Sequence, residues 1–220
     1  LRIKSALIKK NFLNVQFNDG VKTEFIIKDL LSEIYKRNKK KDITFWNAKL
    51  LKKPIFKFKK KLFDTKGGYK VLKDFYKYGF IIIKNAPLEK NYLKKFANII
   101  GILRKTNFGT LFNVRSIRKA SDLAYTSHGL SAHTDNPYRR PIPGIQLLHC
   151  LKNDSVGGHS TLTDGFAIAN HLRRRYPRYF QLLSTIKIRF TYQDSKTILE
   201  NWGETIELNL DKTIKRVRLS

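Results

Sequence analysis

Hydrophobic and polar positions divide the chain into a short N-terminal β unit and a longer mixed region. Two segments rich in β-branched and aromatic residues, Phe12–Phe17 and Val21–Ile27, flank Asn18-Asp19-Gly20, a sequence typical of a tight hairpin turn. Apolar residues at helical spacing follow over Lys28–Tyr35, and a lysine-rich run then indicates a solvated linker. The pattern predicts a small hairpin–helix domain with its linker over residues 1–42.

Residues 43–220 carry both helical and strand patterns. Helical spacing of apolar residues predicts helices over about residues 69–78, 88–100 and 164–176, and a short one from Pro177. The helix at 88–100 is expected to bury Tyr92, Leu93, Phe96, Ile99 and Ile100. Apolar or alternating runs predict strands at Phe80–Ile83, Gly144–Leu151, Ile186–Tyr192 and Thr205–Leu210. We expect a mixed α/β domain with mainly antiparallel strands, arranged as a double-stranded β-helix (jelly roll) with flanking helices.

Composition supports one substantial core and no membrane span. The chain has 220 residues, of which 41% are hydrophobic, including 15 Phe and 10 Tyr. No apolar run approaches the ~20 residues that cross a bilayer. The single cysteine, Cys150, excludes an internal disulfide, suits a reducing compartment and is expected to be buried in an apolar strand. These features predict a cytoplasmic protein.

The formal net charge of +28 raises the question of nucleic-acid binding. The basic residues are spread along the whole chain, and no zinc-finger spacing, RNP signature or basic zipper is present. We therefore expect weak, salt-sensitive binding to polyanions and no specific nucleic-acid partner.

His133-Thr134-Asp135 is the segment with the clearest chemical content. On an extended strand, residues at i and i+2 point to the same side, so the imidazole and the carboxylate would face one point. One histidine and one carboxylate are two of the three ligands in the 2-His-1-carboxylate triad of non-haem Fe(II) oxygenases. A hydrogen-bonded surface pair is the alternative.

The surrounding sequence resembles a known enzyme family. The matching segments, in chain order, are Tyr78–Pro87, Ile100–Gly109, Leu123–Thr126, His133–Tyr138, Pro143–Leu151, Gly157–Ser160 and Asp164–Ala167. Together they resemble the 2-oxoglutarate-dependent oxygenases of the taurine-dioxygenase superfamily, and most closely the γ-butyrobetaine and trimethyllysine hydroxylases. The resemblance implies a jelly-roll enzyme that uses Fe(II), with 2-oxoglutarate and O₂ as cosubstrates. The N-terminal hairpin unit resembles the small leading domain of that family.

The resemblance also implies roles for individual residues. His133 and Asp135 would be the metal ligands and catalytic residues, and Ser160 would bind 2-oxoglutarate. The cage that encloses a trimethylammonium group carries over to Phe108, Phe112 and Tyr125, with Asp122 as an added negative charge. Core packing is the alternative for Phe108 and Phe112, and a plain turn residue is the alternative for Ser160. His149, on an apolar run, is expected to be a buried structural histidine.

Two departures from the family pattern are visible. No cysteine precedes Cys150, and Val21 stands where the family's zinc-binding histidine would align, so no zinc is predicted. The second iron histidine and the arginine for the far carboxylate of 2-oxoglutarate have no counterpart between Thr191 and Ser220. The resemblance therefore implies a fragment truncated at both ends, inactive alone.

The expected function is hydroxylation of a small betaine, most simply γ-butyrobetaine in carnitine biosynthesis. Trimethyllysine or another substrate of the superfamily is the alternative within the enzyme class. A catalytically silent jelly roll that binds quaternary amines is the non-enzyme alternative, and a polyanion-binding protein is a third. The expected partner is the small-molecule substrate, with no membrane partner; a homodimer is left open.

Overall fold

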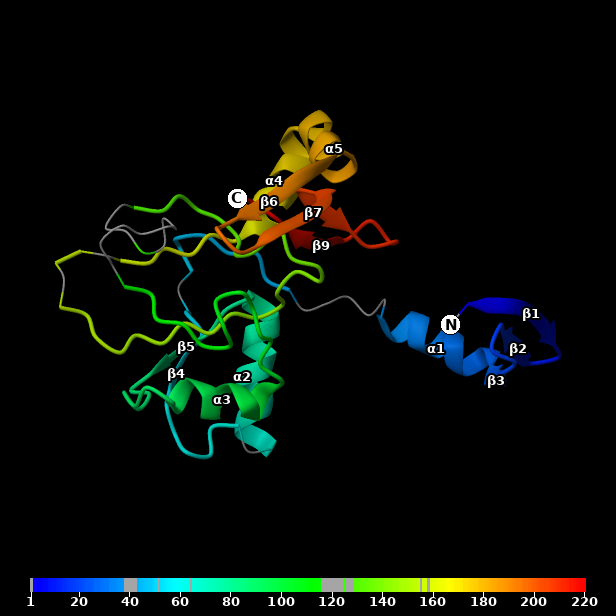
Figure 1. The fold of residues 1–220 in the computed structure, drawn as a ribbon, viewed down its shortest axis with the longest axis horizontal. Coiled ribbons are helices and arrows are strands. Elements are labelled where there is room, and N and C mark those ends of the chain that lie inside the picture. The colour runs from blue at the N-terminus through cyan, green and yellow to red at the C-terminus, as the bar shows by residue number, and fades with distance from the viewer. Residues whose placement is uncertain are drawn as a thin grey trace. The chain divides into compact units, whose positions relative to one another are not determined.

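The computed structural model describes residues 2–37, 43–50, 52–63, 65–115, 125, 129–154, 156–157 and 159–220. The chain forms two compact units, Leu1–Ile43 and Thr44–Ser220 (Figure 1). Each unit has its own secondary structure and is described by itself.

The first unit is a three-stranded antiparallel sheet followed by a helix. Its elements are β1 (Ile3–Lys9), β2 (Phe12–Phe17), β3 (Lys22–Ile26) and α1 (Ile27–Arg37), with strand order β1-β2-β3. The predicted hairpin is confirmed, and its turn places Gly20 at a φ of 91°, where a side chain would be strained. The outer strand β1 was not anticipated, because its side chains are all exposed and its sequence carries no clear alternation.

The second unit begins with a short parallel pair of strands and two helices. Its first elements are β4 (Ile55–Lys57), α2 (Thr65–Tyr78), β5 (Ile82–Lys84) and α3 (Tyr92–Ile100). Gly79 ends α2 with a φ of 77° and donates its N–H to the Phe75 carbonyl at 2.7 Å, as a glycine C-cap does. Val71 is fully buried. The burial expected for Ile99 is wrong: its side chain is 58% exposed, and Ala97 is the buried residue of α3.

The rest of the second unit is a helix pair packed against antiparallel hairpins. Its elements are α4 (Gly165–Arg175), α5 (Pro177–Thr185), β6 (Lys187–Gln193), β7 (Ile198–Glu204), β8 (Ile206–Leu208) and β9 (Ile214–Val217). β6 pairs with β7, and β8 pairs with β9. The core of this part is built from Ala169, Phe180 and Ile206, which lie on α4, α5 and β8. The predicted helices at 164–176 and Pro177, and the predicted strands at 186–192 and 205–210, are confirmed.

Asp164 connects the two parts of the second unit. Its Oδ1 accepts the N–H groups of Phe166 and Ala167, which caps α4, and its Oδ2 accepts the N–H of Trp46 at 2.9 Å. The Trp46 indole N–H in turn donates to the Tyr78 carbonyl at the end of α2, at 2.8 Å. One carboxylate therefore fixes both the start of α4 and the segment that leads to β4.

Arg218 is buried against the β6–β7 hairpin. Its side chain is 6% exposed, and its Nη2 lies 3.5 Å from carboxylate oxygens of both Glu204 and Glu207. The guanidinium occupies the space above Gly203, where a Cβ would collide with it. Its carbon also lies 5.7 Å from the centre of the Phe190 ring.

Three further expectations are wrong. Gly144–Leu151 does not form a strand; it is irregular, and the side chain of Leu148 is 73% exposed. His133–Asp135 also lies outside any regular strand. Cys150 is exposed and not buried. Apolar runs of this length identify strands only when a neighbouring strand pairs with them, and the described residues supply none here.

Over the described residues the chain is mixed α/β, with antiparallel pairing in every sheet except β4–β5. None of the described helices has both the length and the apolar character needed to cross a membrane.

Candidate functional site

The side chains of His133 and Asp135 meet although their backbone is not a strand. His133 Nε2 lies 3.1 Å from Asp135 Oδ1, and the two side chains are 43% and 37% exposed. The two groups therefore face one point, as predicted. The backbone that places them there is irregular and is not the β-strand that was expected.

The orientation of the His133 ring is set by a backbone carbonyl. His133 Nδ1 lies 2.7 Å from the Ser131 carbonyl oxygen, which can only accept, so Nδ1 carries the proton of the neutral ring. Nε2 is then the nitrogen that faces Asp135 Oδ1, at a distance at which a proton or a cation can lie between the two atoms. Two lone pairs at this distance repel each other unless a proton or a cation lies between them.

This donor pair fits a divalent metal ion. Imidazole nitrogen and carboxylate oxygen bind such ions at about 2.1 Å, so two ligands at a right angle lie about 3.0 Å apart. The 3.1 Å between Nε2 and Oδ1 matches that spacing. Among the described residues, no group of three His, Cys, Asp or Glu side chains is close enough to hold a metal ion.

Neighbouring segments hold both donors in place. Thr134 donates its N–H to the Leu219 carbonyl at 2.7 Å, and its hydroxyl accepts the Leu219 N–H at 3.0 Å, which fastens the segment beside the end of β9. The Gln146 amide donates to Asp135 Oδ2 and leaves Oδ1 for the histidine side. Sequence reasoning did not single out Gln146; a lone amide within an apolar run was the available signal.

A tight turn follows Asp135. Asn136 has a φ of 53°, in the left-handed region that asparagine tolerates, and its carbonyl accepts the Arg139 N–H at 3.1 Å. From β7, the Asn201 amide donates to the carbonyls of Pro137 and Arg139 at 3.1 and 3.0 Å. Asn201 thus ties the turn to the sheet, and nothing in its sequence context predicted this role.

Two predicted substrate residues belong to an aromatic cluster. The Phe108 ring lies 5.6 Å from the Phe112 ring and 5.6 Å from the Tyr192 ring, and Tyr192 stacks on Tyr138 at 5.1 Å. We call Phe108, Phe112, Tyr138 and Tyr192 the aromatic cluster. Phe112 is 46% exposed, so packing inside the cluster leaves part of its ring open. Tyr192 was missed because its strand pattern indicated only a half-buried position.

Asp194 is the carboxylate nearest to the aromatic cluster in the hydrogen-bond network. Its Oδ1 accepts the backbone N–H of Lys196 at 2.8 Å, and its Oδ2 accepts the Tyr192 hydroxyl at 2.8 Å. These hydrogen bonds, the one from Lys196 first, hold the pKa of the Asp194 carboxyl below its ordinary value. The ionised carboxylate therefore fixes the orientation of the Tyr192 ring.

The remaining predicted residues are not brought to this site by the described contacts. Ser160 is exposed in an irregular segment before α4, and no hydrogen bond among the described residues joins it to His133 or Asp135. Tyr125 is half-buried and makes no ring contact with Phe108 or Phe112 within the described part of the chain. Asp122 lies outside the described residues.

His149 matches only part of its expectation. Its side chain is half-buried, but its buried Nε2 has no hydrogen-bond partner, whereas a structural histidine was expected to have one. The described contacts do not place it with His133 and Asp135.

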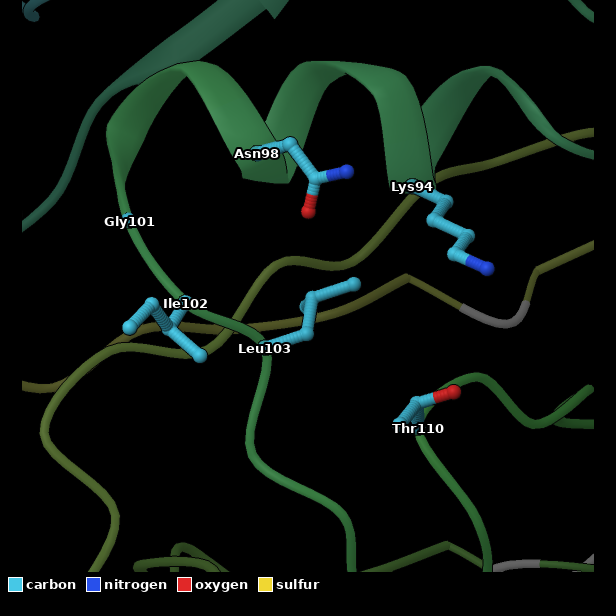
Figure 2. A pocket seen from close by; sticks show the side chains of 6 residues that line it. All are labelled: Lys94, Asn98, Gly101, Ile102, Leu103 and Thr110. Atoms are coloured by element: carbon cyan, nitrogen blue, oxygen red, sulfur yellow. The ribbon is translucent and has the colours of Figure 1, made fainter.

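A separate hollow of about 540 Å³ lies beside α3. Figure 2 shows Lys94 and Asn98 reaching from the helix toward Leu103 and Thr110 on the loop that follows. None of the predicted site residues lines it, although Thr110 lies between Phe108 and Phe112 in the sequence.

Comparison with known proteins places the chain in a family. A family model described as "Taurine catabolism dioxygenase TauD, TfdA family" matches residues 41–216. A γ-butyrobetaine dioxygenase of Pseudomonas sp. (strain AK-1) is 39% identical over 142 residues, covering 64% of this chain and 37% of the relative. The mouse mitochondrial trimethyllysine dioxygenase is 30% identical over 210 residues, covering 93% of this chain and 48% of the relative.

Human γ-butyrobetaine dioxygenase is 33% identical over 147 residues, covering 67% of this chain and 38% of the relative. The chain spans less than half the length of each of these curated relatives. The family match extends over most of the second unit, including the His133–Asp135 pair and the aromatic cluster. The chain belongs to the TauD/TfdA dioxygenase family.

Proposed function

We propose that this protein is a non-haem Fe(II), 2-oxoglutarate-dependent dioxygenase that hydroxylates a small trimethylammonium compound, with γ-butyrobetaine as the first candidate. The observation that carries the proposal is the 3.1 Å approach of His133 Nε2 to Asp135 Oδ1, with the histidine tautomer set by Ser131. Family membership and the names of the similar proteins support the same reaction class.

In this proposal His133 and Asp135 hold the metal, and Ser160 contacts 2-oxoglutarate. The chemistry supplied by the bound metal and 2-oxoglutarate is oxidative: O₂ is consumed, 2-oxoglutarate becomes succinate and CO₂, and a C–H bond of the substrate becomes C–OH. The protein's own contribution is to orient the two donors and to position the substrate. We also propose that the strands of the second unit belong to a double-stranded β-helix, the fold that the family match supports.

The aromatic cluster supports a quaternary-amine substrate. Aromatic faces attract cations within about 6 Å of the ring centre, and neighbouring rings can do so together. Phe108 and Phe112 are neighbouring rings of this kind. We propose Tyr125 and Asp122 as further contacts of the cation. γ-Butyrobetaine is placed before trimethyllysine because the bacterial γ-butyrobetaine dioxygenase shows the higher identity of the two kinds of relative.

The test combines metal binding with turnover. The protein is used in its complete natural form. Co(II), a spectroscopic substitute for Fe(II), is titrated into the metal-free protein, and succinate release from 2-oxoglutarate is measured with Fe(II) and each candidate amine. His133→Ala should weaken Co(II) binding by more than about 100-fold, since losing a ligand exceeds the usual cost of changing an outer-sphere partner. It should also abolish amine-dependent succinate release.

His171→Ala is the matched control, because His171 is an exposed histidine on α4. It should leave both readouts unchanged. Near-normal Co(II) binding by the His133 variant would contradict the ligand assignment. Betaine binding with no effect of metal would instead favour a silent amine-binding protein.

A further inference from the structure

Arg139 is a buried cation to which the described residues supply no counter-charge. Its side chain is 9% exposed, and its Nη2 donates to the Asn107 side-chain carbonyl. Its Nε is buried and has no hydrogen-bond partner. No carboxylate of the described residues lies within ion-pair distance of its guanidinium.

The other buried arginine of the described residues, Arg218, also has an Nε without a partner, but it does have a counter-charge. Arg218, which is 5% exposed, has the carboxylates of Glu204 and Glu207 at 3.5 Å. Burying a guanidinium without an anion costs free energy, because the interior replaces only part of its hydration. A buried arginine that has no carboxylate partner and lies beside a candidate site is expected to bind an anionic ligand.

The surroundings of Arg139 narrow the kind of ligand. Its guanidinium carbon lies 5.9 Å from the centre of the Tyr138 ring, and Tyr138 stacks on Tyr192 within the aromatic cluster. A simple quaternary ammonium ion would be repelled by this neighbouring positive charge. A ligand that carries a carboxylate as well would neutralise Arg139 and place its cation against the rings.

We propose that Arg139 binds the carboxylate of a zwitterionic substrate whose trimethylammonium group contacts the aromatic cluster. This assignment rests on the proposed function for the class of substrate. The geometric basis of the assignment is the Arg139 guanidinium. Its planar set of N–H donors matches the two oxygens of a carboxylate, and its Nη1 donates to none of the described residues. Asn107 accepts a hydrogen bond from Nη2, and in the proposal the ligand carboxylate accepts from Nη1.

The experiment compares γ-butyrobetaine with its methyl ester, which keeps the ammonium group and lacks the charged carboxylate. Binding of each compound to the metal-free protein, in the same form as above, is measured by calorimetry. The unaltered protein should prefer the acid by about 10- to 100-fold, the range expected for a charge-assisted hydrogen bond. Arg139→Met should bind the two compounds equally.

Arg140→Met is the matched control, since it removes the same charge from the adjacent, exposed arginine. It should keep the preference for the acid. The melting temperature separates ligand binding from a structural role: Arg139→Met should melt at the same temperature or higher, because it removes an unpaired buried charge. A lower melting temperature combined with an unchanged preference would show that Arg139 is structural and would overturn the proposal.

If the Arg139→Met variant does not fold, Arg139→Lys tests whether Arg139 binds the substrate carboxylate. This substitution keeps the charge and loses the planar set of N–H donors, so the preference for the acid should fall by about tenfold. An unchanged preference in that variant would overturn the proposal. If an Arg139 variant loses 2-oxoglutarate binding but still prefers the acid, the proposal is also overturned. Arg139 would then bind the cosubstrate and not the substrate.

The outcome is independent of the test of the reaction itself. If the unaltered protein binds acid and ester equally, the role of Arg139 is wrong even when Fe(II)-dependent succinate release is observed. If the preference depends on Arg139 and no succinate is released, the carboxylate site stands and the proposed reaction does not.

Discussion

At the scale of single residues, one backbone carbonyl orients the His133 ring in the way that the proposed metal site needs. The Ser131 oxygen fixes the proton on Nδ1, so that Nε2 is the nitrogen that faces Asp135. Asp135 is oriented by the amide of Gln146 on its other oxygen. Two donors of different type are thus aligned before any ligand arrives.

Gln146 should therefore support metal affinity without being a ligand. Gln146→Leu removes the hydrogen bond to Asp135 Oδ2 and frees that carboxylate to rotate. We expect Co(II) binding to weaken by about tenfold, the low end of the range for outer-sphere partners, because the residue is exposed. Titration of the Co(II) absorption bands measures the change.

Gln181→Leu, an exposed glutamine on α5, is the control and should bind Co(II) like the unaltered protein. A Gln146 variant with unchanged affinity would show that this hydrogen bond does not orient the carboxylate.

The sequence singled out residues with distinctive side-chain chemistry, but it did not single out the residues that hold them in place. His133, Asp135, Phe108 and Phe112 were identified because their side chains have distinctive chemistry and a family pattern. Gln146, Asn201 and Arg139 act through contacts made across the fold, 11 residues apart for the Gln146–Asp135 hydrogen bond and 62 or 64 for the two from Asn201. Contacts of that kind depend on how segments pack, and local pattern does not contain them.

At the scale of elements, the β8–β9 hairpin is stabilised by charges around Glu207. Glu207 Oε1 lies 2.6 Å from Lys215 Nζ, and Oε2 lies 3.3 Å from Arg216 Nη1 and 3.5 Å from Arg218 Nη2. Partial burial raises the pKa of the Glu207 carboxyl, but the hydrogen bond from Lys215 and the charges of Arg216, Lys215 and Arg218 outweigh it. The net pKa is below its ordinary value of 4.5.

This lowered pKa fixes the sign of a pH effect on stability. The stabilisation from Glu207 is complete above the unfolded-state pKa and is lost as the pH falls through the lower folded-state pKa. Glu207→Gln should therefore reduce the free energy of unfolding by about 1–3 kcal/mol at neutral pH, since it also leaves Arg218 with one carboxylate fewer. The loss should be smaller at about pH 3 than at neutral pH, because the stabilisation declines as the pH falls below the ordinary pKa of 4.5.

Urea unfolding at both pH values measures this difference. Glu89→Gln is the control, because the Glu89–Lys95 pair is 67% and 69% exposed and should contribute little at either pH. A Glu207 variant with the same loss at both pH values would contradict the charge mechanism.

Elements with local start and stop signals were predicted correctly. Asp164 caps α4 with its own carboxylate, and Gly79 ends α2 in a conformation that glycine favours. The Gly144–Leu151 segment failed for the opposite reason, because an apolar run becomes a strand only when another strand supplies its hydrogen bonds. Whether a partner strand is present depends on the tertiary structure, and the local sequence of the segment does not reveal it.

At the scale of the whole molecule, positive charge is the dominant property outside the site. The chain has 45 Lys and Arg residues against 17 Asp and Glu. Such an excess attracts polyanions through release of their counterions, with little dependence on sequence. This attraction needs no dedicated surface and is compatible with the proposed enzyme.

Nucleic-acid binding should accordingly be non-specific and strongly salt-dependent. We expect affinity for a short single-stranded DNA to fall by about 10³-fold or more between 50 and 200 mM salt, because several phosphates are neutralised together. Unrelated base sequences should bind alike, as measured by fluorescence anisotropy. Sequence preference that persists at high salt would instead support a nucleic-acid-binding function.

Gly203 and Arg218 lie 15 positions apart, yet they occupy one volume. The guanidinium fills the space that any larger residue at 203 would need, and it is held there by Glu204 and Glu207. A methyl group at 203 would push the guanidinium away from these two carboxylates. The tolerance of position 203 for a larger residue is therefore set by the side chain at 218, and shortening Arg218 should make Gly203→Ala less costly.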